Sequence, residues 1–378
     1  MKIIESKYHT CIVTFPISRA FRMPLLNLVD VVSHISKKTS VIIGSYDDME
    51  LDYPYDSNVS VKQFDIGKSS DLLRRIVRFV KFQIWALISF LRIINETDVI
   101  IFFMEWDPLL FIIISKFFGK KTIWMLPSSA PLMRKYNADP LLAFSKYTEW
   151  LSYRLSKVII LLSENLIKDW DLVEWEKKIV IAHNHFIDFH QFKITKSYCD
   201  REQMVGYIGR FSKEKGTGNF LKAAELILKD YPEVLIFLGG SGDLKKCKFD
   251  LNIFQEQDQI RIRGWIPHDN LSNALNDLKL LVIPSNTEGL PNMMLEALAC
   301  GTPVLATPVG GIPDVIRDNE TGFIMESNTP ECIVDNVFRA LRSPYLERVS
   351  ENGKYFVEEK FTFEKTVEKW RKILDENT

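Results

Sequence analysis

The sequence contains little cysteine, and its cysteines form no recognisable pattern. They are odd in number and scattered through 378 residues: Cys11, Cys199, Cys247, Cys300 and Cys332. No CxxC pair is present that could hold a zinc ion or carry out thiol redox chemistry. Few, unpaired cysteines are typical of proteins from a reducing compartment. We therefore expect a cytoplasmic protein without a disulfide framework.

Neither an excess of charge of one sign nor a long apolar run is present. Lysine and arginine total 48 against 49 aspartates and glutamates, so no overall field attracts a polyanion and we expect no nucleic-acid partner. The longest apolar runs, 82–91 and 109–115, are much shorter than the ~20 residues that span a bilayer. The first residues lack the charged, apolar and small-residue sections of a signal peptide. We expect a chain that is neither exported nor membrane-spanning.

Motifs of metalloenzymes, serine hydrolases and ATPases are also missing. The sequence has no HExxH pair, no GxSxG turn and no GxxxxGK[ST] loop. Five histidines show no acidic partner at metal-ligand spacing: His9, His34, His183, His185 and His190. His268 is expected in a loop after Trp265, as part of the polar surface. Metal binding is not indicated, and we expect no required cofactor.

Short β-branched runs alternate with longer helical patterns, which favours parallel strands joined by crossover helices. This alternation runs from residue 11 to residue 162 and starts again at residue 204. A length of 378 residues predicts two or more cores, at about 150 residues per domain. We therefore predict two α/β domains and a terminal helix, over 1–185, 186–360 and 361–378.

The stretch SNTEGLPNMMLEALACGTPVLATP, 285–308, combines a predicted helix start with two carboxylates. Pro291 suits the first position of a helix, and Gly301 suits the residue just past its end. The first-turn N–H groups of such a helix favour a phosphate. A carboxylate can accept hydrogen bonds from vicinal hydroxyls, so Glu288 and Glu296 match a ribose diphosphate that carries a sugar. Alternatively, Glu288 only favours the helix dipole and Glu296 is a solvated helix position.

Two further strand ends carry residues suited to a phosphate ligand. The stretch 205–224 places Arg210 and Lys215 in a turn between a strand and a helix, where ligands collect at the end of a parallel sheet. The stretch 235–246 ends a strand in a glycine-rich turn around Gly240, which allows backbone to approach a ligand closely. Taken singly, the cations are also compatible with surface charges and the glycines with an ordinary turn.

In their order and spacing, the segments GRFSKEKG, FLGGSGD, RGWIPHDNL and SNTEGLPNMMLEALACGTPV resemble the C-terminal domain of the family 4 retaining glycosyltransferases of the GT-B fold. The most specific feature is a glutamate, seven residues and a second glutamate, followed by CGTPV and a GGIPD turn. The resemblance extends over roughly 180–378. It implies two Rossmann-like parallel-sheet domains that face a cleft, an acceptor site on the first, a nucleotide-sugar site on the second, and a terminal helix that crosses back to the first.

Position by position, the resemblance implies that Glu296 binds the ribose of a UDP- or GDP-linked sugar donor. Glu288 would contact the donor sugar, and Arg210 with Lys215 would neutralise the diphosphate, so these three are the predicted catalytic residues. The remaining predicted contacts to donor sugar, phosphate and base are Gly289, Leu290, Pro291, Asn292, Met293, Gly240, Gly264 and Trp265.

The N-terminal half departs from the family pattern at two places. Where family members often have a glycine-rich loop after the first strand, this chain has TFPISRAFRMP, which contains no glycine. Where many have a histidine after a later strand, this chain has Leu126 and Pro127. Candidate substitutes are backbone N–H groups near Ser128 and Ser129 or the side chains of Arg19, Arg22 and Glu105. A structural role is the alternative for Glu105.

The stretch 70–94 is basic and amphipathic. Arginines and a lysine alternate with apolar residues at helical spacing: Arg74, Arg75, Arg78 and Lys81 beside Leu73, Ile76, Val80 and Trp85. One interpretation is a surface helix that meets anionic lipid headgroups at the inner face of a membrane. The other is a core helix with a solvated basic edge. The sequence leaves both open.

Together these features predict a retaining hexosyltransferase that acts on a hydroxyl of a glycan or lipid-linked acceptor, in polysaccharide or glycolipid biosynthesis. Two other functions stay open. A nucleotide-sugar epimerase is one, because epimerases of that type share the GT-B architecture. A non-catalytic partner subunit that binds nucleotide or lipid is the other, because the loop after the first strand departs from the family.

Overall fold

The computed structural model describes residues 8–15, 22–45, 58–67, 71–104, 107–128, 142–242 and 258–377. The chain divides into two compact units. Unit 1 comprises Met1–Phe186 together with Phe363–Thr378, and unit 2 comprises Ile187–Thr362. The predicted first domain ends at residue 185, and the first segment of unit 1 ends at Phe186. The predicted second domain ends at residue 360, and the second segment of unit 1 begins at Phe363.

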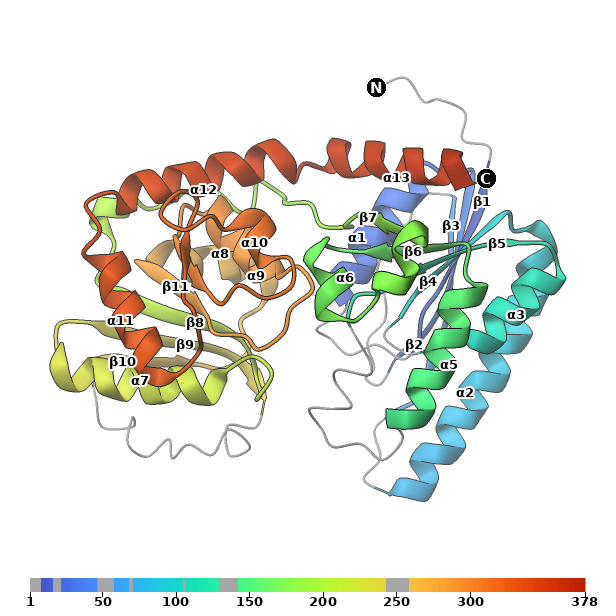
Figure 1. Ribbon diagram of the computed structural model, residues 1–378, viewed down its shortest axis with the longest axis horizontal. Coiled ribbons are helices and arrows are strands. Elements are labelled where there is room, and N and C mark those ends of the chain that lie inside the picture. The colour runs from blue at the N-terminus through green and yellow to red at the C-terminus, as the bar shows by residue number, and fades with distance from the viewer. Residues whose placement is uncertain are drawn as a thin grey trace. The chain divides into compact units, whose positions relative to one another are not determined.

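The sheet of unit 1 is parallel throughout its seven strands (Figure 1). Its spatial order is β3 (Val59–Asp65), β2 (Lys38–Ser45), β1 (His9–Val13), β4 (Val99–Phe103), β5 (Lys121–Met125), β6 (Val158–Leu161) and β7 (Ile179–Ile181). The central strand β4, VIIFF, is buried along its whole length, as expected for a strand covered on both faces. The edge strand β3, VSVKQFD, is only half-buried, so its sequence lacks the continuous apolar run of a central strand.

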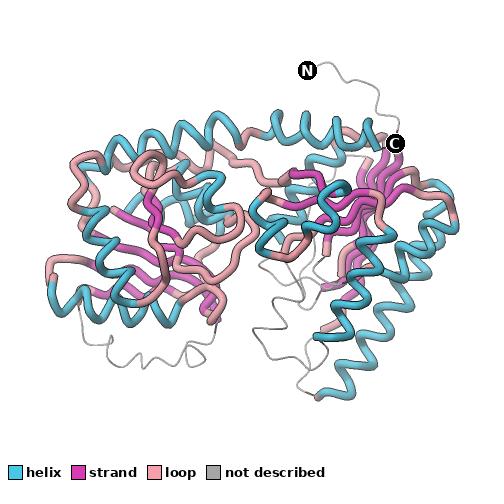
Figure 2. The backbone as a smooth tube through the Cα atoms, viewed as in Figure 1, coloured by secondary structure: helices cyan, strands magenta, loops and turns pink. Residues whose placement is uncertain are grey.

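Helices cover both faces of this sheet (Figures 1 and 2). On one face lie α2 (Leu72–Ile93), α3 (Leu109–Phe117) and α5 (Leu142–Leu155), and on the other lie α1 (Arg22–Ser33) and α13 (Phe363–Asn377). Right-handed crossovers produce this division, because connections that advance in opposite directions along a parallel sheet pass over opposite faces. Shorter helical segments are η2 (Ile94–Glu96), α6 (Asn165–Asp169) and η3 (Val173–Lys178). None of the described helices is both long and apolar enough to cross a bilayer.

The C-terminal helix α13 packs into unit 1. The indole N–H of Trp370, which is completely buried, donates to the carbonyl oxygen of His183 at 3.0 Å. Thr366 donates its hydroxyl to the carbonyl oxygen of His185 at 3.1 Å. These two bonds join α13 to the end of the first segment of unit 1, immediately before unit 2 begins.

Unit 2 contains a second parallel sheet, of six strands (Figure 1). Its order is β10 (Ile260–Arg263), β9 (Leu235–Gly242), β8 (Met204–Phe211), β11 (Leu280–Ile283), β12 (Val304–Ala306) and β13 (Phe323–Ile324). Its helices are α7 (Thr217–Asp230), α8 (His268–Asp277), α9 (Asn292–Ala299), α10 (Ile312–Val315), α11 (Pro330–Leu341) and α12 (Leu346–Lys360), with the short η4 (Tyr198–Asp200). The prediction of two Rossmann-like parallel-sheet domains is confirmed.

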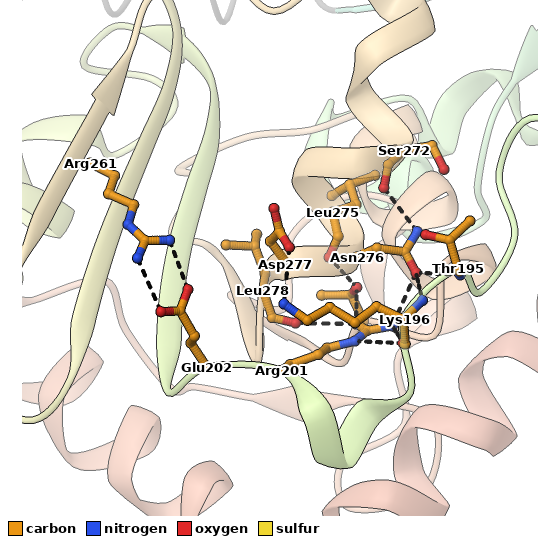
Figure 3. A network of polar contacts seen from close by, with 11 residues as sticks. Thr195, Lys196, Arg201, Glu202, Arg261, Ser272, Leu275, Asn276, Asp277 and Leu278 are labelled. Atoms are coloured by element: carbon orange, nitrogen blue, oxygen red, sulfur yellow. Dashed lines mark hydrogen bonds and ion pairs between the residues drawn. The ribbon is translucent and has the colours of Figure 1, made fainter.

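A buried arginine ties three segments of unit 2 together. Arg201 is 4% exposed and uses its guanidinium N–H groups on five acceptors: the carbonyl oxygens of Lys196, Leu278 and Cys300, the side-chain oxygen of Asn276 and the hydroxyl of Thr302. Figure 3 shows Arg201 with Lys196, Asn276 and Leu278. Because these acceptors lie before η4, at the end of α8 and at the end of α9, the arginine sets the position of both helices.

Each sheet has one point where the chain reverses the direction in which strands are added. In unit 2 this point lies between β8 and β11, and in unit 1 it lies between β1 and β4. In open α/β sheets, ligands bind beyond the carboxyl ends of the strands at such a point. We therefore expect the ligand site of unit 2 at the loops after β8 and β11.

Candidate functional site

The loops after β8 and β11 lie against each other. Gly216 has φ +68°, and a Cβ added to it would lie 1.9 Å from the carbonyl oxygen of Pro284, so only glycine fits. The N–H of Asn286 donates to the carbonyl oxygen of Glu214 at 2.8 Å, and the Asn286 amide donates to that of Lys213 at 2.9 Å. These hydrogen bonds thus hold the two loops together at the predicted ligand site.

This arrangement of the loops brings Lys215 and Glu288 together. The Lys215 Nζ lies 2.7 Å from Oε2 of Glu288, and the Ser285 hydroxyl donates to Oε1 at 2.7 Å. The carboxylate side chain is 8% exposed and the lysine side chain 25%. Both oxygens of Glu288 therefore have a partner, whereas Lys215 keeps part of its surface open to solvent.

Arg210 lies one residue before the end of β8 and five residues before Lys215. Its side chain is 41% exposed, and its Nη2 lies 3.4 Å from Oε1 of Glu214. An exposed guanidinium at the carboxyl end of a strand can turn toward an anion at low cost, because the pair it leaves is a surface ion pair. The structure thus places Arg210 at the carboxyl end of β8 and Lys215 on the loop that follows it.

Glu296 and His268 form a second pair, which corrects two expectations. His268 is the first residue of α8 rather than part of a surface loop, and its Nε2 lies 3.0 Å from Oε1 of Glu296. Glu296 is buried, with 7% of its surface exposed, so the alternative of a solvated helix position is wrong. The Gln191 amide donates to the carbonyl oxygen of His268 at 2.8 Å and holds the start of α8. The hydrogen bond to Glu296 raises the pKa of His268.

The raised pKa of His268 predicts a pH-dependent contribution to stability. A histidine whose pKa is higher in the folded than in the unfolded protein adds stability that is full below about pH 6.5 and is lost as the pH rises through the folded value. His268→Asn should therefore lower the free energy of unfolding in urea more at about pH 6 than at about pH 8.5. The same substitution at the exposed His190 should have little effect at either pH. Equal losses for His268→Asn at both values would contradict the assignment.

Helix α9 begins one residue later than predicted. Pro291 has ψ 119° and is the residue before the helix, and no side chain caps its N-terminus. The first-turn N–H groups of Asn292 and Met293 lack an intrahelical acceptor, as in every α-helix. Gly310 packs against this loop, because a Cβ there would lie 2.1 Å from the carbonyl oxygen of Glu288. The N-terminus of α9 thus offers N–H groups next to the Lys215–Glu288 pair.

Gly240, near the end of β9, is required by the packing of the sheet itself, whereas a Cβ on Gly264, after β10, would meet no atom of the described residues within 4 Å. Gly240 has φ +139°, and a Cβ there would lie 1.8 Å from the carbonyl oxygen of Gly209 in β8. Its N–H donates to the carbonyl oxygen of Gly264 at 3.1 Å. Trp265, the next residue, is 57% exposed. The need for glycine at position 240 therefore follows from strand packing and requires no ligand.

The N-terminal candidates are only partly described. Arg19, Glu105 and Ser129 lie outside the described residues. Arg22 begins α1, and Ser128 follows β5; the Nε of the first and the hydroxyl of the second are buried without a hydrogen-bond partner among the described residues. Within the described ranges, no three histidine, cysteine, aspartate or glutamate side chains gather where they could hold a metal ion.

Comparison with known proteins identifies the family of unit 2. Residues 191–356 match the family described as "Glycosyl transferases group 1". An uncharacterized glycosyltransferase of Methanocaldococcus jannaschii is 30% identical over 171 residues, 45% of this chain and 47% of that protein. The N-acetyl-alpha-D-glucosaminyl L-malate synthase of Bacillus anthracis is 28% identical over 229 residues, 58% of this chain and 59% of that protein. The chain thus spans about half the length of the curated relatives it matches.

The fold is similar to that of solved GT-B proteins along nearly the whole chain. HepE of Anabaena, solved in complex with UDP, has a TM-score of 0.74, with 13% identity over 97% of this chain and 100% of that one. Identity this low shows the fold alone. Combined with the family match, it confirms the resemblance seen in the sequence: residues 191–356 belong to the glycosyl transferases group 1 family, in a chain with the GT-B fold.

Proposed function

We propose that this chain is a retaining glycosyltransferase that moves a hexose from a nucleoside diphosphate sugar to a hydroxyl of a glycan or lipid-linked acceptor. One observation carries the proposal. The switch point of unit 2 gathers a solvent-accessible lysine from the loop after β8, the uncapped N-terminus of α9 and two hydrogen-bonded carboxylates, Glu288 from the loop after β11 and Glu296 from α9. These are complementary to the diphosphate, the sugar and the ribose of such a donor.

The cations and N–H groups of this site would act on the leaving group. When the bond between the anomeric carbon and the phosphate oxygen breaks, negative charge develops on the diphosphate. Lys215, Arg210 and the first turn of α9 stabilise that charge in place, which is the kind of electrostatic preorganisation that lowers a barrier most. The acceptor oxygen forms its new bond on the face that the leaving group vacates, and its proton passes to the departing phosphate oxygen. No enzyme nucleophile is needed.

The carboxylates would hold the two ends of the donor. His268 engages Oε1 of Glu296, which leaves Oε2 to accept from ribose hydroxyls. Glu288 accepts from Lys215 and Ser285, and each of its oxygens retains a second lone pair for a sugar hydroxyl. UDP is the favoured nucleotide because HepE was solved with it, and GDP is the second choice. The reaction requires no cofactor on this proposal.

The acceptor would bind to unit 1. The carboxyl ends of β1 and β4 flank the switch point of that sheet, which is the corresponding ligand position. The buried Nε of Arg22, at the start of α1, supports this choice because it has no hydrogen-bond partner among the described residues.

The test is transfer by the purified chain. Incubation with UDP- or GDP-linked hexoses and hydroxyl acceptors, followed by NMR of the product, should show release of nucleoside diphosphate and an unchanged anomeric configuration. An inverted product would refute retention. Interconversion of the donor sugar without acceptor would indicate an epimerase. Nucleotide binding without turnover on any acceptor would indicate a partner subunit.

Donor binding should also raise thermal stability. A ligand that binds only the folded state at 100 times its Kd adds about 2.7 kcal/mol. Glu296→Gln should weaken donor affinity by about 10- to 100-fold and shrink the shift, because a carboxylate that accepts hydrogen bonds contributes about 1.5–3 kcal/mol. The matched control is Glu225→Gln, an exposed glutamate in the middle of α7. Equal shifts in both variants would remove Glu296 from the donor site.

A further inference from the structure

Helix α2 exposes an apolar stripe. Val77, Val80, Ile84, Ile88 and Leu91 recur every three or four residues, so they share one face of the helix, and each is between 41% and 55% exposed. The opposite face packs on the sheet. The helix is therefore apolar on both its buried and its exposed face. This does not fit the interpretation of 70–94 as a core helix with a solvated basic edge.

Helix α3 continues this apolar surface. Leu110, Ile113 and Phe117 also share one face, and Phe117 is 87% exposed. The two helices are in contact, because the rings of Phe90 and Phe111 lie 5.3 Å apart in an edge-to-face arrangement. Figure 1 shows α2 and α3 side by side on one face of the unit 1 sheet. We call the exposed apolar residues of these two helices, together with the cations beside them, the α2–α3 face.

Within α2 and α3 the charges are all of one sign, and an acidic partner beside them is Asp71, directly before α2, which lies 3.7 Å from Arg74. Neither helix contains an aspartate or glutamate, and exposed cations border the apolar stripes: Arg74, Lys81, Arg92 and Lys116. This local excess contrasts with a formal net charge of −1 for the whole chain. A hollow of about 350 Å³ opens on the face, with Lys81 and Arg92 among its lining residues and Ile84, Trp85 and Ile88 as its apolar part.

We propose that the α2–α3 face docks on a lipid bilayer that contains anionic headgroups. Apolar side chains would enter the boundary between headgroups and acyl chains while the cations meet the lipid phosphates, as in helices that lie in the plane of a membrane. A second copy of this chain does not fit, because the cations of one copy would meet those of the other. The hollow between Lys81 and Arg92 has the apolar lining and charged rim that suit one phospholipid. This proposal concerns unit 1 and does not depend on the donor site.

The test is sedimentation with vesicles of phosphatidylcholine alone or with about 30% phosphatidylglycerol. The full chain should bind the anionic vesicles at least about tenfold more tightly and should lose binding in high salt. Lys81→Gln/Arg92→Gln should weaken binding about 30-fold, since each cation near an anionic surface contributes about a fivefold factor. The matched control is Lys222→Gln/Lys229→Gln on α7, two exposed lysines of unit 2.

A second variant removes the apolar component. Ile84→Ser/Ile88→Ser/Phe117→Ser should weaken vesicle binding at least about tenfold, whereas Val173→Ser/Tyr345→Ser/Tyr355→Ser, also at exposed positions, should not. Donor-induced thermal shifts should be the same in all these variants, which separates this proposal from the proposed function. No binding by the full chain, equal binding to both vesicle types, or equal binding by face and control variants would overturn the proposal.

Discussion

Lys215→Met is expected to reduce kcat/KM for sugar transfer by about 10²–10³-fold, the usual effect of removing one preorganised group that stabilises developing charge. The lysine is 25% exposed, lies on the loop after β8 and pairs with Glu288, four residues before the uncapped N-terminus of α9. Its charge should matter more in the transition state than in the ground state, because the diphosphate becomes more negative as the sugar leaves. Most of the loss should therefore appear in kcat.

Lys213→Met is the matched control, because Lys213 lies two residues away and is exposed, whereas Glu214 pairs with Arg210 and Glu288 with Lys215. Lys215→Met also leaves the buried Glu288 without its cation, so stability must be measured in parallel. The double variant Lys215→Met/Glu288→Gln removes that unpaired charge and should recover stability without recovering activity. Similar kcat/KM values for Lys215→Met and Lys213→Met would exclude Lys215 from catalysis.

Arg201→Leu is expected to lower the free energy of unfolding by about 3–5 kcal/mol, within the range measured when one partner of a buried charged network is removed. Arg201 is 4% exposed and satisfies five acceptors. Leucine would leave the buried carbonyl oxygens of Leu278 and Cys300 without that donor, and such groups are costly to bury alone. Urea denaturation followed by circular dichroism measures the change.

Arg261→Leu is the contrasting variant. Arg261 forms a bidentate ion pair with Glu202, with N···O distances of 2.8 and 3.1 Å. These distances are as short as those of the Arg201 network, and Figure 3 shows both arginines. The side chains of Arg261 and Glu202 are both 46% exposed, however, so water screens the pair and its loss should cost less than about 1 kcal/mol. If Arg261→Leu were as destabilising as Arg201→Leu, burial would not be what distinguishes them.

Much of the fold could be predicted from local patterns. Buried parallel strands such as VIIFF are continuous apolar runs, which a sequence shows directly. β3 lacks such a run, because an edge strand is only half-buried and tolerates lysine and glutamine. The sequence predicts that α9 starts at Pro291, whereas the helix starts at Asn292. Proline is common at the first helical position, and here it is the residue before the helix.

The sequence alone predicts the two-sheet α/β organisation, the family resemblance of residues 191–356 and the loop–helix segment that carries Glu288 and Glu296. These follow from periodicity and short-range spacing, which the chain order preserves. Only the tertiary structure decided that Lys215 pairs with Glu288 across 73 positions and His268 with Glu296 across 28. It also decided that the apolar stripe of α2 is exposed. Partners distant in the chain and the burial of a helix face depend on which elements pack together, and no local pattern encodes that packing.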